Sequence, residues 1–306
     1  MMRVVRAQGR SRVGGLLFDQ PYLLLSLTSL FWAGNIVLGR AVVGHIPPVT
    51  LSVVRWAGAV VVLLPFAARH LIRDWPTIRK RAGILSFLAL TGFSAYNTFA
   101  YYGLQYTTAI HGLLLQSVAP LFVALWTFVL FRDRLTLRQA AGILLSLIGV
   151  VVIICRGSPA VLTSFEFNQG DLWFIAALLI YAFYTAMLRR RPAIHPLSFL
   201  AIGMGVGALW LLPVMLLELL AGRTVTFDAE TLGSFVYICI FPSLLGYLFL
   251  NRSIELIGAN RAAPFIHLVP VFGSALAIAL LGEHFYLYHA IGYALVFAGI
   301  TLATKR

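Results

Sequence analysis

Polar and aromatic side chains recur in the middle of long apolar runs of this sequence, where contact with bulk water does not explain them. Trp32 and Asn35 are three residues apart, and Asn97 and Tyr101 are four apart, so each pair shares one helix face. Rings stack on apolar groups and cations, and amides hydrogen-bond carboxylate and ammonium groups. These residue types predict a lining for small amphipathic solutes, made by Trp32, Asn35, Tyr96, Asn97, Tyr101, Gln116, Tyr181, Tyr184 and His267 and, as a second group, by Arg55, His111, Tyr247 and Asn251.

Composition identifies the elements that must position this lining. Of the 306 residues, 60% are hydrophobic and 11% are charged, against roughly 45–50% and 25% in soluble domains. Such a chain needs the lipid bilayer as its solvent, and in lipid the backbone must satisfy its own hydrogen bonds, so the spans are helices. The net charge of +13 comes from short basic clusters between apolar runs rather than from one basic domain, so nucleic acid is not an expected partner.

Ten apolar runs are long enough to cross a bilayer, for which roughly 20 residues are needed. We expect an all-α integral membrane protein with ten transmembrane helices, preceded by a basic N-terminal segment at 1–20 that is not a cleaved signal peptide. The longest link, 156–170, separates two five-helix units at 21–155 and 171–304. The predicted spans are 21–41, 48–68, 83–104, 108–131, 136–155, 171–190, 197–219, 231–252, 260–281 and 286–304.

Lysine and arginine fix the orientation of these spans. If the spans alternate, 19 of the 23 basic residues fall on one side, and only Arg156 and Arg223 fall on the other; Arg40 and Arg55 lie inside or at the edge of spans one and two. Because basic links stay in the cytoplasm, both termini are predicted to be cytoplasmic. Arg55 lies roughly two turns into the second span from the opposite side, where it either extends its guanidinium to the interface or binds a substrate carboxylate.

The second half of the chain repeats the first. A shift of 150 residues aligns spans three to five with spans eight to ten without gaps. Each half has five spans, an odd number, so the halves must lie upside down relative to one another around a central cavity. Inverted repeats are typical of secondary transporters, although a duplication without bearing on function is an alternative. The aligned pairs include Pro120 and Pro270, Asp133 and Glu283, Gly142 and Gly292, and Gly149 and Gly299.

One motif, Pro-x12-Glu followed by Gly-x6-Gly, is formed by Pro270, Glu283, Gly292 and Gly299, and its first-half copy has Asp133 in place of glutamate. The pattern resembles the two EamA-type repeats of the drug/metabolite transporter superfamily. The aromatic-rich middle resembles the YddG-type bacterial exporters of aromatic amino acids in that superfamily. The resemblance implies a multi-pass protein of the bacterial inner (plasma) membrane, a monomer or weak homodimer, that exports amino acids and similar metabolites by alternating access.

The repeated prolines and glycines have structural interpretations. Pro120 and Pro270 fall near the middle of spans four and nine. There, each proline either kinks its helix, which frees carbonyls and forms a hinge, or only packs against its neighbours without a role in function. The glycines of spans five and ten let helices approach closely, as an internal scaffold or as a dimer face. Thr136 and Gln139 have capping-box spacing at the start of span five.

The lining residues also have interpretations without a solute. A tyrosine near a span edge, such as Tyr101, can belong to an interfacial belt or a gate, and His111 and His267 can be held by hydrogen bonds within the protein. All ten carboxylates lie at or beyond predicted span ends, whereas proton- and sodium-coupled carriers often use one at the midplane. We therefore expect transport down a gradient, with at most weak coupling through histidine.

Other functions find less support in the residues. The seven histidines are scattered, no HExxH or P-loop motif is present, and Cys155 and Cys239 lack metal or redox spacing, so we expect no catalytic residues, metal or cofactor. An intramembrane enzyme and a channel are alternatives of other classes. A carrier of drugs, nucleotide sugars or phosphorylated metabolites is a third, although phosphate favours several arginines at mid-depth and only Arg55 qualifies.

Overall fold

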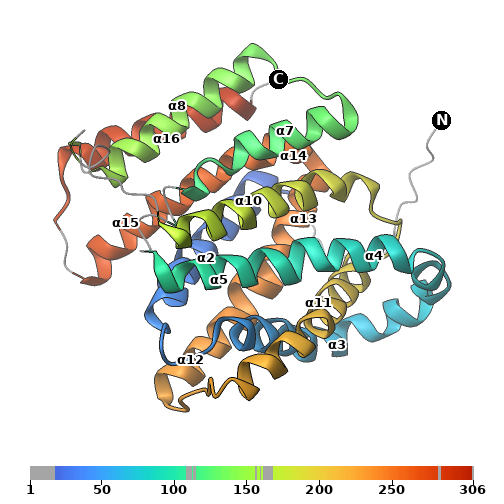
Figure 1. Cartoon of the computed structure of the whole chain (residues 1–306). Coiled ribbons are helices and arrows are strands. Elements are labelled where there is room, and N and C mark those ends of the chain that lie inside the picture. The colour runs from blue at the N-terminus through green and yellow to red at the C-terminus, as the bar shows by residue number, and fades with distance from the viewer. Residues whose placement is uncertain are drawn as a thin grey trace, which may run out of the picture.

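The computed structural model describes residues 18–107, 112, 115–155, 157–158, 160, 168–281 and 284–304, so His111 and Glu283 lie outside the described residues. Within this part of the chain every regular element is helical (Figure 1). The elements are α2 (Pro21–Ala41), α3 (Pro48–Lys80), α4 (Ala82–Ala89), η1 (Leu90–Ala95), α5 (Tyr96–Tyr106), α7 (Ala119–Phe131), α8 (Leu137–Ile154), α10 (Gln169–Met187), η2 (Leu188–Arg190), α11 (Pro196–Leu220), α12 (Ala229–Ile238), η3 (Cys239–Leu245), α13 (Gly246–Ile257), α14 (Ala259–Ala262), η4 (Ala263–His267), α15 (Leu268–Leu281) and α16 (Leu287–Thr304).

Seven helices of the described chain are long and apolar enough to cross a membrane: α2, α3, α8, α10 with η2, α11, α12 through α13, and α16. Large apolar side chains such as Val61, Phe66 and Leu217 are exposed on their outer faces. Soluble proteins rarely expose contiguous apolar surface on this scale, because water solvates it poorly. The protein is therefore a multi-pass membrane protein whose outer surface is solvated by lipid.

α3 is longer than the sequence predicts. The apolar run ends near residue 68, but the helix continues to Lys80, so the basic residues of 69–80 are helical rather than a loop. Arginine and lysine are good helix formers, and the end of an apolar run marks the membrane edge, not the end of a helix. Asp74 on this extension accepts a hydrogen bond from the backbone N–H of His195 at 2.8 Å, which ties α3 to the start of α11.

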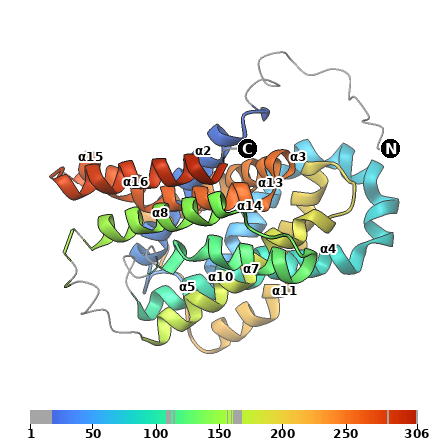
Figure 2. The same ribbon diagram turned by 90° about the horizontal axis from the view of Figure 1, so that it is seen from above.

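The helices of the two halves pack in matched pairs. α8 packs most extensively against α16, followed by α3 against α11, and each pair joins equivalent helices of the two halves. The contact of α5 with α10 has its counterpart in that of α13 with α2, and the contact of α7 with α10 in that of α15 with α2. α8 and α16 lie side by side at one edge of the molecule in both views (Figures 1 and 2). The internal repeat in the sequence is thus accompanied by a repeat in the packing.

The motif glycines form the α8–α16 contact. A Cβ on Gly142 would lie 2.5 Å from the backbone N of Ala303 and 2.6 Å from the carbonyl oxygen of Gly299. A Cβ on Gly149 would lie 2.7 Å from the carbonyl oxygen of Gly292. All four glycines therefore pack against the facing helix of the same chain. The dimer-face alternative is wrong for them, because no free glycine face remains.

Helix breaks occupy equivalent positions in the two halves. The π-helical segments η1 and η3 lie about one repeat length apart, between α4 and α5 and between α12 and α13. π-helical turns are rare and often lie at functional sites. Pro120 and Pro270 differ from the prediction, because they lie in the first turns of α7 and α15 rather than in mid-helix. In each case the helix is interrupted before the proline. Proline is tolerated in a first turn, because the N–H it lacks would have no helical partner there.

Candidate functional site

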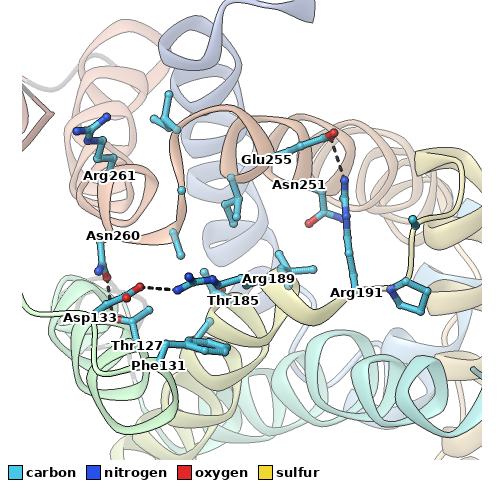
Figure 3. A pocket seen from close by; sticks show the side chains of 18 of the residues that line it. Thr127, Phe131, Asp133, Thr185, Arg189, Arg191, Asn251, Glu255, Asn260 and Arg261 are labelled. Atoms are coloured by element: carbon cyan, nitrogen blue, oxygen red, sulfur yellow. Dashed lines mark hydrogen bonds and ion pairs between the residues drawn. The ribbon is translucent and has the colours of Figure 1, made fainter. Parts of the chain in front are cut away.

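A cavity of about 940 Å³ opens on one side of the bundle, and we call it the vestibule (Figure 3). Four links that the charge pattern assigns to one side contribute to its wall, through Arg73, Asp133, Arg191 and Arg261. We call this the arginine-rich side. Further lining residues include Thr127, Phe131, Arg189, Asn251, Glu255 and Asn260.

Ion pairs hold the wall of the vestibule in place (Figure 3). Arg189 lies 2.9 Å from Asp133, and Arg191 lies 2.9 Å from Glu255. Arg261 has neither an ion pair nor a hydrogen bond among the described residues. Four arginines and three carboxylates line the vestibule, so its wall carries a small excess of positive charge. Such a mouth attracts solutes with an anionic group.

A smaller pocket continues from the vestibule, and we call it the inner pocket. The two share Thr185 and Ile254 in their walls, and three predicted lining residues, Trp32, Gln116 and Tyr181, come together in the inner pocket. Its volume of about 40 Å³ holds a few water molecules at most, not a solute the size of an amino acid. Its other lining residues include Leu25, Thr28, Ser29, Pro120, Val123, Leu178, Leu250 and Phe265.

Buried rings in tilted and edge-to-face contact lie beyond the inner pocket. The Tyr181 ring lies 4.3 Å from that of Tyr96 and 5.7 Å from that of Trp32. The Tyr247 hydroxyl donates to the carbonyl oxygen of Gly92 in η1 at 2.7 Å, which fixes the ring against the π-helical segment. Bulky rings in mutual contact leave no room for a solute to pass. The buried rings in this group, which we call the aromatic cluster, are those of Trp32, Trp56, Phe93, Tyr96, Tyr181, Tyr184 and Tyr247.

Arg55 lies directly behind the aromatic cluster. Its side chain is 1% exposed, so the interpretation in which it extends to the membrane interface is wrong. Nη1 donates to Asn35 Oδ1 at 3.1 Å and to the Tyr101 hydroxyl at 2.8 Å, and Nη2 donates to the Pro242 carbonyl oxygen at 3.3 Å. The Tyr101 hydroxyl also donates to Asn35 Oδ1 at 2.8 Å. We call these four residues the Arg55 network; it connects α2, α3, α5 and η3.

Four buried polar atoms along this path have no hydrogen-bond partner among the described residues: Gln116 Oε1, the Tyr181 hydroxyl, Asn251 Nδ2 and Arg55 Nε. Gln116 and Tyr181 line the inner pocket, and Asn251 lines the vestibule. A buried polar atom without a partner costs about 1–3 kcal/mol. Groups left in this condition beside a cavity are suited to hydrogen-bond a solute.

His267 and Asn97 occupy different positions from the inner-pocket residues. Both ring nitrogens of the fully buried His267 are engaged, Nδ1 with Ser146 Oγ and Nε2 with the Ser117 carbonyl oxygen, each at 2.6 Å. Asn97 lies 3.4 Å from the Tyr247 hydroxyl, within the closed region. Neither residue lines the vestibule or the inner pocket. The geometry of His267 therefore fits the hydrogen-bonded alternative.

Small hydroxyl residues of the path are absent from the sequence prediction. Thr28, Ser29 and Thr185 line the inner pocket. The Ser29 hydroxyl lies 2.9 Å from the Leu25 carbonyl oxygen of its own helix and 2.8 Å from that of Phe265 in η4. Serine and threonine are tolerated at every depth of a membrane helix, because they return their hydroxyl to the backbone. Their type alone therefore does not indicate a site.

An apolar helix bundle whose vestibule leads to a smaller pocket lined by rings and polar groups is consistent with a membrane protein that binds a small molecule. The EamA-like transporter family matches residues 20–155 and again residues 168–305. The chain therefore belongs to the EamA-like transporter family and contains two EamA repeats.

Several curated relatives are similar over most of the chain. The "uncharacterized transporter YyaM" of Bacillus subtilis is 28% identical, over 92% of this chain and 93% of its own. A "probable amino-acid metabolite efflux pump" of Salmonella typhimurium is 27% identical, over 90% of this chain and 92% of its own. A "probable terminal-alkyne amino-acid exporter" of Streptantibioticus cattleyicolor is 28% identical, over 74% and 76%.

A solved crystal structure shares the fold. It superposes with a TM-score of 0.73 over 93% of this chain and 95% of its own, at 19% identity. At this identity the similarity concerns the fold alone.

Proposed function

We propose that this protein is a secondary transporter that exports amino acids, including aromatic ones, and similar small metabolites by alternating access. The observation that carries the proposal is the vestibule that leads to an inner pocket beside aromatic rings, where Gln116 Oε1 and the Tyr181 hydroxyl have no partner among the described residues. Rings suit an apolar side chain, and free amide and hydroxyl groups suit ammonium and carboxylate groups. The two relatives named for amino-acid export or efflux support this cargo.

In this proposal the chain crosses the bacterial inner membrane ten times, with both termini in the cytoplasm. Three segments complete the set: α4 through α5, α7 with residues 115–118, and α14 through α15. The units 21–155 and 171–304, joined by 156–170, are inverted repeats. The matched contacts between the halves and the gathering of arginine-bearing links at the vestibule support this arrangement.

The transport cycle in this proposal opens the two sides in turn. With the arginine-rich side in the cytoplasm, the structure corresponds to the cytoplasm-open state, and the aromatic cluster with the Arg55 network closes the other side. Opening that side requires the rings of Tyr181 and Tyr247 to separate. The helix breaks that precede Pro120 and Pro270 are our candidates for the hinges.

The cargo's own gradient is the proposed driving force. Asp171 and Glu218 are the deeply buried carboxylates of the described chain. Asp171 caps the first turn of α10, and Glu218 binds the start of α3, so both act at helix ends. No carboxylate among the described residues lines the inner pocket. Cargo accumulation driven strongly by a proton gradient in liposomes would contradict this part of the proposal.

Counterflow in liposomes tests the cargo. Purified protein is reconstituted with an unlabelled amino acid inside, and the entry of a labelled panel of amino acids, drugs and sugars is followed. We expect labelled aromatic amino acids to enter faster than into protein-free liposomes. If drugs or sugars enter while no amino acid does, the cargo assignment is wrong.

Removal of one hydroxyl group from the inner pocket tests the site. Tyr181→Phe removes a hydroxyl that has no hydrogen-bond partner among the described residues, so we expect unchanged thermal stability and an apparent affinity for amino acids about two- to tenfold weaker. Tyr184→Phe is the matched control, because its hydroxyl lies 3.4 Å from Asn251 Oδ1, a bond within the protein. An equal loss of affinity in both variants would contradict a specific role of Tyr181.

A further inference from the structure

Arg55 is a buried cation without a buried anion. Among the described residues no carboxylate lies within ion-pair distance of it, and its neighbours Asn35, Tyr101 and the Pro242 carbonyl are all neutral. A charged side chain inside a membrane protein is costly unless it is paired, and unpaired ones mark sites for charged solutes.

One edge of the guanidinium is incompletely used. Nη1 makes two bonds, at 2.8 and 3.1 Å, whereas Nη2 makes one long bond of 3.3 Å and Nε makes none. Nε and Nη2 form the edge that binds a carboxylate through two parallel hydrogen bonds. The edge suited to a carboxylate is therefore the one that the protein leaves nearly free.

Aromatic rings separate this edge from the inner pocket. The guanidinium carbon lies 4.7 Å from the centre of the Trp56 ring, which in turn lies 5.2 Å from that of Tyr247. Trp32, which lines the inner pocket, donates to the same Pro242 carbonyl oxygen at 3.2 Å. Separation of these rings would connect the inner pocket with Arg55.

The geometry points to Arg55 as the residue that binds the carboxylate of the transported solute, so that the cargo class is amphipathic molecules with a free carboxylate. This inference rests on the proposed transport function. The solute carboxylate occupies the Nε and Nη2 edge and replaces the Pro242 carbonyl. The replacement breaks this hydrogen bond between α3 and η3, and we infer that it couples carboxylate binding to opening of the closed side.

The test compares probes that differ in one group. L-phenylalanine, 3-phenylpropionate and L-phenylalaninamide are bound to purified protein, and the apparent Kd is taken from the rise in melting temperature with probe concentration. In the wild type we expect the two carboxylates to bind about ten- to a hundredfold more tightly than the amide, the usual range for a hydrogen bond to a charged group. In Arg55→Gln we expect that advantage to be lost and the amide affinity to be unchanged.

Two further variants keep the result interpretable. Arg40→Gln is the matched control, because Arg40 is an exposed arginine of α2 that donates to the Leu104 carbonyl oxygen at 2.7 Å, and we expect wild-type affinities. Arg55→Lys keeps the charge but not the two-donor edge, so it should lose roughly tenfold for the carboxylates only. It also serves if Arg55→Gln does not fold.

The outcomes separate this inference from the proposed function. If both Arg55 variants keep the carboxylate advantage, or if the wild type has none while it still exchanges amino acids in counterflow, the Arg55 assignment is wrong and the transport function stands. If the wild type binds none of the three probes and moves only other cargo, the amino-acid proposal fails and this inference fails with it.

Discussion

The two ends of the proposed solute path differ in how their positive charges are paired. At the vestibule, most arginines are paired with carboxylates, as in Arg189 with Asp133, whose side chains are largely exposed. At the closed end, Arg55 is buried among neutral acceptors. The two lie far apart, since Arg73 at the vestibule is 18 residues after Arg55 on α3, roughly 27 Å along the helix axis.

The difference shows which contacts resist movement. Water screens an exposed ion pair, which contributes about 0–1 kcal/mol and can be exchanged at little cost. A buried hydrogen bond to a charged group contributes about 1.5–3 kcal/mol, and its loss leaves a desolvated group unpaired. The contacts at the closed end therefore contribute more to stability, and substitutions there should lower stability more than substitutions at the vestibule.

Tyr101→Phe should have the largest effect. It removes the hydroxyl that accepts from Arg55 and donates to Asn35, at a cost of about 1–3 kcal/mol, seen as a melting temperature lower by several degrees. Tyr102→Phe is the matched control, because its hydroxyl lies 3.3 Å from that of exposed Tyr106. Equal melting temperatures for the two variants would mean that the Arg55 network does not stabilise the closed end.

Glu218→Gln should have the second-largest effect on stability. The carboxylate accepts from the backbone N–H groups of Val49 and Thr50 at 3.1 and 2.9 Å, and so caps α3 in place of Pro47, whose side chain cannot. We expect a loss of about 1 kcal/mol in thermal or denaturant unfolding, the usual contribution of a cap. Glu230→Gln, in the exposed first turn of α12, is the control and should leave stability unchanged. A comparable loss of stability in both variants would mean that Glu218 does not act as a specific cap of α3.

Arg189→Gln should change stability by less than about 1 kcal/mol, because its ion pair is at the vestibule and both side chains are largely exposed. The small difference should disappear in high salt. Arg190→Gln is the control, since both arginines lie over the Phe131 ring but the 2.9 Å ion pair belongs to Arg189. A larger loss that persists in salt would show that the vestibule wall is as firmly held as the closed end.

The smallest expected effect is on thermal stability at acid pH. The hydrogen bond from the Thr231 backbone N–H lowers the pKa of Asp228, the N-cap of α12, from its ordinary value of 3.8. Because the folded pKa lies below the unfolded one, this stabilisation is present above about pH 3.8 and is lost as the pH falls through the folded pKa. Asp228→Asn keeps a capping oxygen but does not titrate, so its melting temperature should fall less steeply than that of the wild type below pH 4. Parallel curves would contradict the assignment.

Features governed by local composition could be predicted from the sequence. The family and the transmembrane character follow from apolar runs and motif spacing, and the Thr136 and Gln139 capping box is confirmed. Trp32, Gln116 and Tyr181 do converge on one pocket, since polar and aromatic groups within a membrane bundle avoid lipid. Their role in binding a solute stays a prediction.

Features that depend on contacts between distant segments could not be predicted. The break before Pro270 and the pairing of His267 with Ser146 require a neighbouring helix that periodicity does not reveal. The neutral surroundings of Arg55 depend on three segments that meet only in the fold, and one partner is the backbone carbonyl of Pro242, which no residue type indicates.

The contact between α8 and α16 has a mechanical consequence. Its glycines bring the two backbones together without intervening side chains, and each helix belongs to a different half. Backbones at this distance can neither slide past each other nor separate without a large loss of contact. In the proposed transport cycle, the axis about which the halves rotate should therefore pass close to this seam, and the greatest displacement should fall on the helices furthest from it.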